Sequence, residues 1–202
     1  MDYHILLRHT DGKKIYVDPQ EEEGFFLYPG EVRKAGLHDG DVLSRDRFDQ
    51  IFQEYAVPRA RRRALGLLAK KDMTEKELWD KLEKSCNDSR SSAMAVAFVR
   101  EHGYIDDEAY AKDYFYSHKG KKSFRQIRQN LLNKGIPSDI LRKVEQEEGD
   151  QAPEDIYPLV VRYARKFPDL DYVSVRKIVA HFARKGYRTD TIMGIIRQIR
   201  ES

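Results

Sequence analysis

The second half of the chain contains one segment that is used twice. Shifting residues 123–144 by 51 positions places them on residues 174–195, and six identities then fall into line. These are Ser123 with Ser174, Arg125 with Arg176, Ile127 with Ile178, Lys134 with Lys185, Gly135 with Gly186 and Asp139 with Asp190. Self-similarity at a fixed spacing is the signature of a supersecondary unit repeated in tandem. The chain is therefore expected to fold as a repeat array.

The recurring residues have roles that predict a pair of helices. Ser123 and Gln126 have the spacing of a capping box, in which side chains satisfy the first free backbone N–H groups. Ile127 and Leu131 lie four apart and share one face. Gly135 can adopt the left-handed conformation that ends a helix. Ser138 is the expected cap of the next helix. The same roles are expected one repeat later at Ile178, Phe182, Gly186 and Thr189.

A weaker copy lies upstream, at an offset of 49, where Thr74, Leu78 and Leu82 match Ser123, Ile127 and Leu131. Thr74 and Glu77 form another capping-box pair. Further helical stretches at residues 59–69, 91–102, 108–118 and 156–167 complete the pattern. We therefore expect a mostly α fold: three-helix repeats at residues 58–105, 106–150 and 151–202, in an elongated, curved array. A period near 50 differs from those of tetratricopeptide and ankyrin repeats.

Residues 1–57 have a different pattern and predict a small β-containing head. Residues 3–7 and 15–17 are strand-like, and the turn at residues 10–13 holds an Asp-Gly pair, a strong hairpin signal. Residues 25–28 suggest a third strand that ends at Pro29 and Gly30. Gly36 and Gly40 suggest loops, and Asp46 is the expected cap of a short helix that ends near residue 55.

The charges are distributed unevenly between these regions. Residues 1–58 carry 7 Lys and Arg against 12 Asp and Glu, whereas residues 59–202 carry 30 against 22. A basic body with an acidic head favours a polyanionic partner for the body. The single cysteine, Cys86, cannot form a disulfide framework, and no apolar run approaches the ~20 residues of a membrane helix. We therefore expect a cytoplasmic protein without a secretory signal or a membrane span.

Catalytic chemistry is not indicated by the sequence. The six histidines have no metal-ligand spacing, and no glycine-rich phosphate loop, nucleophile elbow or Cys/His cluster occurs. Asp106, Asp107 and Glu108 could form a metal site or an acid–base pair. Acidic residues at the start of a helix are the favoured interpretation, because the helix dipole stabilises negative charge there. We expect no catalytic residue, metal or cofactor, and hence a protein that is not an enzyme.

Basic residues form the candidate binding surface. The chain has no acidic residue between Asp113 and Asp139, and several of its cations recur one repeat later. Like charges at equivalent positions can form a stripe that follows a phosphate backbone. A solvated helix face is the alternative for any single residue. The expected filament- or nucleic-acid-binding residues are Lys119, Lys121, Lys122, Arg125, Arg128, Lys134, Arg176, Lys177, Arg184 and Lys185.

Aromatic residues near this window have two interpretations. Tyr110 and Tyr114 lie four apart, as core-facing residues on a helix do. Stacking on nucleic-acid bases is the alternative role for such rings. Core packing is the favoured interpretation.

Three segments together resemble the RecX family: LLAKKDMTEKELWDKL at residues 67–82, VREHGYIDDEAYAKDY at 99–114 and FRQIRQNLLNKGIPSDIL at 124–141. The resemblance covers about residues 58–200. It implies a modulator, usually an inhibitor, of the RecA recombinase and co-protease in DNA repair and the SOS response. RecX-like proteins are thought to lie in the groove of the RecA filament on single-stranded DNA. The expected partners are the RecA filament and DNA, either single-stranded alone or also double-stranded. The protein is expected to be a monomer that contacts the DNA through its phosphate backbone.

Two features depart from the family pattern. Lys122 and Ser123 precede the helix at residue 124 where the family often has glycine, and an acidic stretch at residues 145–155 introduces a divergent third unit. Two other classes of function stay open. Three-helix units can act as helix-turn-helix modules of a DNA-binding regulator, and a helical scaffold can bind protein alone. Tandem units with charge spread over all of them fit backbone tracking better than half-site reading.

Overall fold

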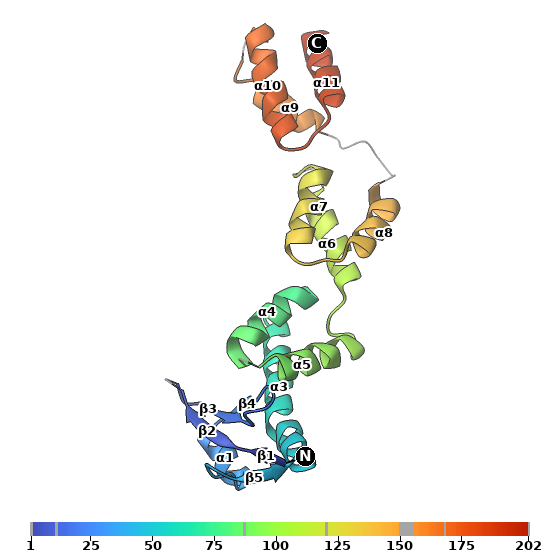
Figure 1. Cartoon of the computed structure of the whole chain (residues 1–202). Coiled ribbons are helices and arrows are strands. Elements are labelled where there is room, and N and C mark those ends of the chain that lie inside the picture. Colours follow the sequence, from blue (N-terminus) through green and yellow to red (C-terminus); the bar gives the residue numbers. More distant parts are fainter. Residues whose placement is uncertain are drawn as a thin grey trace. The chain divides into compact units, whose positions relative to one another are not determined.

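The computed structural model describes residues 2–10, 12–86, 88–119, 121–149, 156–167 and 169–201. Its contacts divide the chain into two compact units, Met1–Asp106 and Asp107–Ser202 (Figure 1). The fold is mostly helical with a small β-containing head, as the sequence predicted. Within the described residues, no helix is both long and apolar enough to cross a membrane.

The head contains two small antiparallel sheets. Strands β2 (Leu6–His9), β3 (Ile15–Asp18) and β4 (Phe25–Leu27) form one sheet, in the order β2-β3-β4. The predicted hairpin is confirmed by the pairing of His9 with Ile15, although Asp11 of its turn lies outside the described residues. Strands β1 (Asp2–His4) and β5 (Val42–Ser44) form the second sheet. The single strand predicted at residues 3–7 is therefore two strands, which separate at Ile5.

The predicted third strand ends before Pro29, as expected, but Pro29 also begins a helix that was not predicted, α1 (Pro29–Ala35). Proline suits the first helical position, where its missing N–H has no intrahelical partner in any case. The Glu31 carboxylate accepts a hydrogen bond from the Tyr28 N–H at 2.8 Å and so caps the start of the helix. Gly36, with φ of 67°, ends the helix in the left-handed conformation.

A continuous helix leads from the head into the first three-helix group. Helix α2 (Arg45–Ile51) passes into a π-helical turn, η1 (Phe52–Ala56), and then into α3 (Val57–Leu68). The cap is Ser44, whose hydroxyl accepts from the Arg47 N–H at 3.3 Å, and not Asp46 as predicted. The wider π turn accommodates Pro58, which has no N–H and would clash with a carbonyl in a regular turn. The boundary expected at residues 57/58 lies inside this helix.

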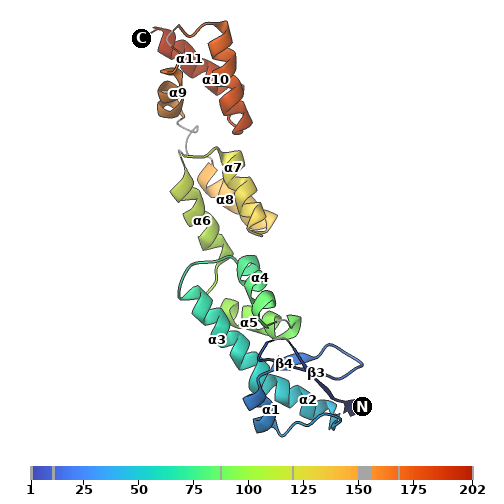
Figure 2. The same ribbon diagram turned by 90° about the vertical axis from the view of Figure 1, so that its left-hand side faces the viewer.

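The first three-helix group consists of α3, α4 (Glu75–Cys86) and α5 (Ser89–Glu101). The predicted capping box is confirmed: the Thr74 hydroxyl accepts from the Glu77 N–H at 3.1 Å, and the Glu77 carboxylate accepts from the Thr74 N–H at 3.4 Å. Helix α3 joins two cores, since Val57 is buried in the head and Ala60 in the three-helix group. Figures 1 and 2 both show α3 running from the head into this group.

Charged contacts fix the head to the first three-helix group. The Arg59 guanidinium pairs with the Glu31 carboxylate and donates to the Phe26 carbonyl. Lys14 donates to the Ser85 carbonyl. These side chains are largely enclosed; that of Arg59 is 17% exposed. The head and this group therefore form one packed unit, which is the first of the two compact units, Met1–Asp106.

The second unit contains two three-helix groups. Helices α6 (Asp107–His118), α7 (Phe124–Asn133) and α8 (Ser138–Gly149) enclose one core, and α9 (Tyr157–Ala164), α10 (Tyr172–Arg184) and α11 (Thr189–Glu201) enclose another. The boundary predicted between the second and third repeats, at residues 150/151, lies outside the described residues.

Most local signals of the repeat have the predicted geometry. The Ser123–Gln126 capping box is present, and Gly135 and Gly186 have φ of 85° and 89°. The predicted caps at Ser138 and Thr189 are wrong, because α8 and α11 begin at these residues. Their first backbone hydrogen bonds go to the carbonyls of the preceding residues, Pro137 and Arg188. A third difference is at α10, where the Asp171 carboxylate accepts from the Ser174 N–H at 2.8 Å, so the helix begins a turn earlier than α7.

Candidate basic interface

The ten predicted cations differ in their surroundings. Seven are exposed: Lys119, Lys121, Arg125, Arg176, Lys177, Arg184 and Lys185. Lys122 and Arg128 are partly buried against partners in the second unit. Lys134 is also partly buried.

Two of the partly buried cations lie against an aromatic column on α6. Tyr110, Tyr114 and His118 are four residues apart in turn, and Tyr114 stacks on His118 with ring centroids 3.9 Å apart. The Lys122 ammonium donates to the Tyr114 hydroxyl at 3.1 Å, and the Lys134 ammonium lies 5.4 Å from the Tyr110 ring centroid. Cations above aromatic faces are attracted by the ring quadrupole. Both tyrosines also pack against the core, as predicted.

Ion pairs hold α8 against its neighbours. Arg128 of α7 pairs with Glu145 at 2.5 Å, and Glu108 of α6 accepts from Lys112 at 2.8 Å and from Lys143 at 2.6 Å. Hydrogen bonds from these two ammonium groups lower the pKa of Glu108. The acidic run at residues 106–108 therefore lies where α6 begins and contributes an ion pair to packing. No cluster of potential metal ligands occurs among the described residues.

Three predicted cations meet where α7 begins and α10 ends. The Ser123 hydroxyl donates to the Lys185 carbonyl. A β-carbon placed on Gly186 would lie 2.9 Å from the Ser123 oxygen and 3.0 Å from the Arg125 β-carbon. Lys121, just before α7, donates to the Ser117 carbonyl at 3.1 Å. The structure thus brings Lys121, Arg125 and Lys185 to one corner. Arg176 and Lys177 lie more than two turns away along α10.

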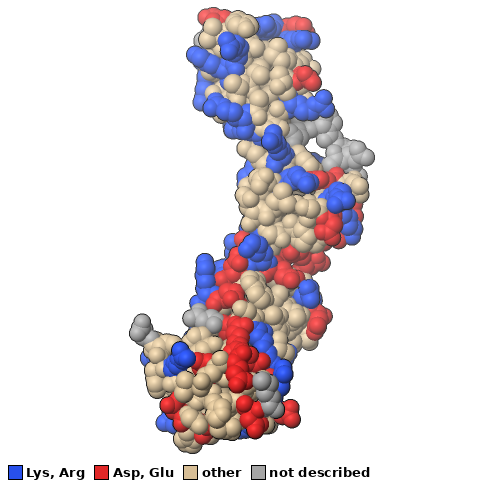
Figure 3. Space-filling model, in the orientation of Figure 1, with Lys and Arg blue, Asp and Glu red and all other residues tan. Residues whose placement is uncertain are grey.

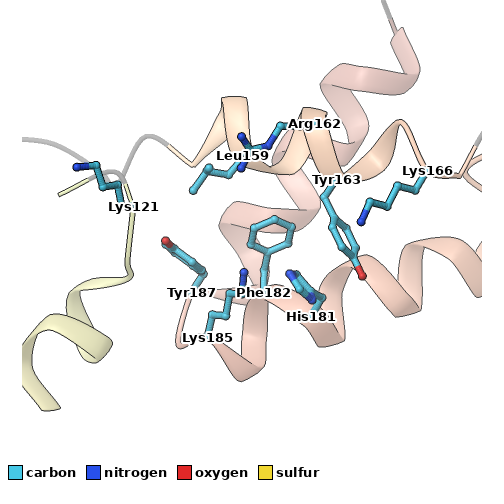
Figure 4. Close-up of a pocket in the computed structure, with 9 residues that line it drawn as sticks. All are labelled: Lys121, Leu159, Arg162, Tyr163, Lys166, His181, Phe182, Lys185 and Tyr187. Carbon is cyan, nitrogen blue, oxygen red and sulfur yellow. The ribbon is translucent and has the colours of Figure 1, made fainter. Parts of the chain in front are cut away.

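A cavity of about 230 Å³ opens at this corner. Figure 4 shows basic side chains around it and aromatic rings from α9 and α10 inside it. The basic residues are Lys121, Arg162, Lys166 and Lys185, and the rings are those of Tyr163, His181, Phe182 and Tyr187. Phe182 and Tyr187 are almost fully buried, at 3% and 5% exposed. The site is a small concave surface with an apolar floor and a positive rim.

Sequence reasoning missed Arg162, Lys166 and His181 as members of this site. The sequence does contain a spacing that could have indicated them: Arg162 and Lys166 are four residues apart, and so are His181 and Lys185. Residues four apart share a helix face. The sequence does not show that the two faces would be turned toward one cavity.

His181 is the titratable group at the centre of the site. Its ring stacks on that of Tyr163, with centroids 4.1 Å apart and an angle of 11° between the planes. Burial lowers its pKa below the ordinary 6.5, and the positive charges of Lys185, Arg184 and Lys166 lower it further. The imidazole is therefore mostly neutral near pH 7. The three-helix group α9–α11 is strongly basic, with 10 Lys and Arg against 4 Asp and Glu in residues 156–201. Figure 3 shows one face of this group, on which Lys and Arg predominate over Asp and Glu.

Comparison with known proteins connects this architecture to one family. Residues 106–144 match the family model described as RecX, second three-helix domain. "Regulatory protein RecX" of Clostridium botulinum (strain Eklund 17B / Type B) is 22% identical over 198 residues, which cover 96% of this chain and 92% of the relative. The protein of the same name from Caldanaerobacter subterraneus subsp. tengcongensis is 26% identical, over 93% and 94% of the two chains. The chain is similar to RecX proteins over nearly its whole length.

Solved RecX structures have the same fold. A crystal structure of regulatory protein RecX covers 98% of this chain with a TM-score of 0.66 at 20% identity. RecX from Lactobacillus salivarius covers 73% of it with a TM-score of 0.64 at 23% identity. The segment that matches the RecX model includes α6, α7 and the first part of α8. Six of the ten predicted cations lie in it; the cavity is formed mainly by α9 and α10, beyond it.

Proposed function

We propose that this RecX-like chain binds the RecA filament on single-stranded DNA and inhibits its recombinase and co-protease activities. The observation that carries the proposal is the basic corner of the second unit, where Lys121, Arg125 and Lys185 meet. No ion pair engages these three side chains within the described residues. The curated relatives are named regulatory proteins, which supports a role in regulation and not in catalysis.

The proposed contact surface contains the exposed cations and excludes the partly buried ones. Lys119, Lys121, Arg125 and Lys185 are its centre, and Arg176, Lys177 and Arg184 extend it along α10. Lys122, Arg128 and Lys134 act indirectly, by holding α6, α7 and α8 together. We expect the chain to act as a monomer in the cytoplasm and to contact DNA phosphates through this surface.

Charge reversal at the corner tests the proposal. A variant with Lys121→Glu, Arg125→Glu and Lys185→Glu is expected to fold, because these side chains are exposed, and to lose inhibition of the DNA-dependent RecA ATPase and of RecA-stimulated cleavage. Its DNA binding should also respond less to salt, by roughly 0.7 in the log–log slope for each lost phosphate contact on a single strand. Circular dichroism and thermal unfolding would verify the fold.

The matched control reverses three exposed cations in the first unit instead. Arg62, Lys70 and Lys71 are exposed and engage in no ion pair with the described residues, so their reversal to Glu should leave inhibition unchanged. A folded corner variant that still inhibits RecA fully would contradict the proposed surface.

Mobility shifts of random single strands, with and without RecA, distinguish this function from its alternatives. A filament regulator should shift the RecA–DNA complex further than the bare strand. A DNA-binding regulator would shift the bare strand equally without RecA, and a protein-only scaffold would shift no bare strand.

A further inference from the structure

We propose that the cavity between α9 and α10 is a phosphate-binding pocket, in which Arg162, Lys166 and Lys185 hold the oxyanion. The proposal goes beyond RecA regulation, because it concerns a site that needs neither RecA nor a filament to bind its ligand.

The first argument is uncompensated charge. Arg162 and Lys166 come from α9 and the turn after it, Lys185 comes from the end of α10, and none of the three forms an ion pair with a described residue. Among the residues that the structure describes, no carboxylate lines the cavity. Elsewhere in the same unit, Arg128, Lys112 and Lys143 each face a glutamate. A cleft lined by one sign of charge concentrates its field on a counter-ion.

The second argument is the floor beneath these cations. Phe182 and Tyr187 are buried, and Tyr163 stacks on His181, so one side of the cavity is apolar and shields the site from water. Charge interactions are stronger where water is excluded. An arginine beside lysines also matches a phosphate group, because the guanidinium can donate two parallel hydrogen bonds to it.

The size of the cavity limits its ligand. Sites for drug-sized molecules span ~300–1,000 Å³, and this cavity of about 230 Å³ is smaller. It suits a single phosphate group together with a small part of its carrier. The carrier can be a free phosphate compound or one phosphodiester of a nucleic-acid strand, and the chemistry of recognition is the same for both.

His181 provides a built-in reporter. The groups that face it are the Tyr163 ring and Lys166 from the α9 side, and Arg184, Phe182 and Lys185 on its own helix. Burial and these cations lower its pKa. A phosphate dianion in the pocket would offset the cations and raise the pKa again. Binding should therefore be accompanied by proton uptake at this imidazole.

The experiment is an NMR titration of the full chain with inorganic phosphate at fixed pH, against sodium chloride at matched ionic strength. We expect a saturable shift of the His181 ring resonances, identified by their absence in His181→Gln. The other five histidines should show no comparable response. In the double variant Arg162→Gln and Lys166→Gln, the shift should be lost or should need at least tenfold more phosphate.

The control variant removes two charges from the same group outside the pocket. Arg165 and Arg197 are exposed and do not line the cavity, so Arg165→Gln with Arg197→Gln should keep the phosphate response. The proposal is overturned if phosphate causes no saturable shift of His181, or if the control variant loses the response equally.

Competition identifies the carrier. If oligothymidylate displaces phosphate from the pocket, the ligand is a strand phosphodiester; if it does not, the pocket binds free phosphate compounds. A response to polyglutamate without any response to phosphate would overturn the proposal in favour of an acidic protein partner. RecA inhibition by the same variants is measured separately, so the pocket and the proposed function can fail independently.

Discussion

Lys134 and Lys185 occupy the same position in two copies of the repeat, yet their environments differ. Both follow the last residue of a helix, with φ of −82° and ψ of −1°, and both precede a glycine of positive φ. Lys134 is partly buried against the rings of Tyr110 and Tyr114 on another helix, whereas Lys185 is exposed, lies over Phe182 of α10 and lines the cavity. The sequence predicts the backbone position because capping signals are local. It cannot predict the environment, which depends on residues from other helices.

The glycines that end these helices should be the least replaceable. Gly135→Val places a β-branched residue at a φ of 85°, and Gly186→Ala adds a clash with Ser123 to a φ of 89°. Each change should destabilise the second unit by about 1–3 kcal/mol, measured by urea unfolding. Gly194→Ala is the control, since this helical glycine has open space at its β-carbon and should gain about 0.5–1 kcal/mol. Unchanged stability in Gly135→Val would contradict the assigned helix end.

The lowered pKa of His181 gives a prediction with a definite sign. Between the folded pKa and the ordinary value of 6.5, the unfolded chain binds more protons than the folded chain. Folding stability should therefore decrease as pH falls through this window, since protonation favours the unfolded state. Urea unfolding at about pH 7.5 and about pH 5.5 should show a larger loss for the natural chain than for His181→Gln. Equal losses would mean that this pKa is not lowered in the folded protein.

At the scale of helices and strands, local signals were predictive and context-dependent ones were not. The capping boxes at Thr74 and Ser123 and the left-handed Gly135 follow from a few neighbouring residues, and all three are confirmed. Helix α1 was missed because Pro29 is read as a stop as readily as a start. The continuous helix through Pro58 was missed because a π turn has no simple sequence signature. The cavity depends on tertiary packing and was also missed.

The corrected start of α10 can be tested by removing caps. Ser123→Ala should cost about 0.5–2 kcal/mol, because Ser123 caps α7, and Asp171→Ala should cost a similar amount at α10. Ser174→Ala should cost less than either, although Ser174 matches Ser123 in the repeat, because it lies inside the helix. If Ser174→Ala were the most costly of the three, the repeat alignment would be the better guide to the cap. Urea unfolding of the three variants provides the comparison.

For the whole molecule, the repeat makes a prediction that is independent of the contacts within each unit. Tandem units that contact mainly their neighbours are expected to form an elongated, curved array. Small-angle scattering should then give a radius of gyration clearly above the ~17 Å of a compact protein of this length. A value at the compact expectation would contradict the predicted array. The head is expected to contribute little to DNA binding, because its net charge is negative.

The helix that runs from Arg45 to Leu68 constrains how heads can be exchanged between relatives. A head joined through a loop could be replaced by another at almost any position. Here the junction lies within a helix, where each inserted residue advances the chain by 1.5 Å and rotates everything before it by about 100°. A single insertion or deletion between Val57 and Ala60 would turn Arg59 or its partner Glu31 out of register. Grafted heads should therefore function only when the fusion preserves helical phase.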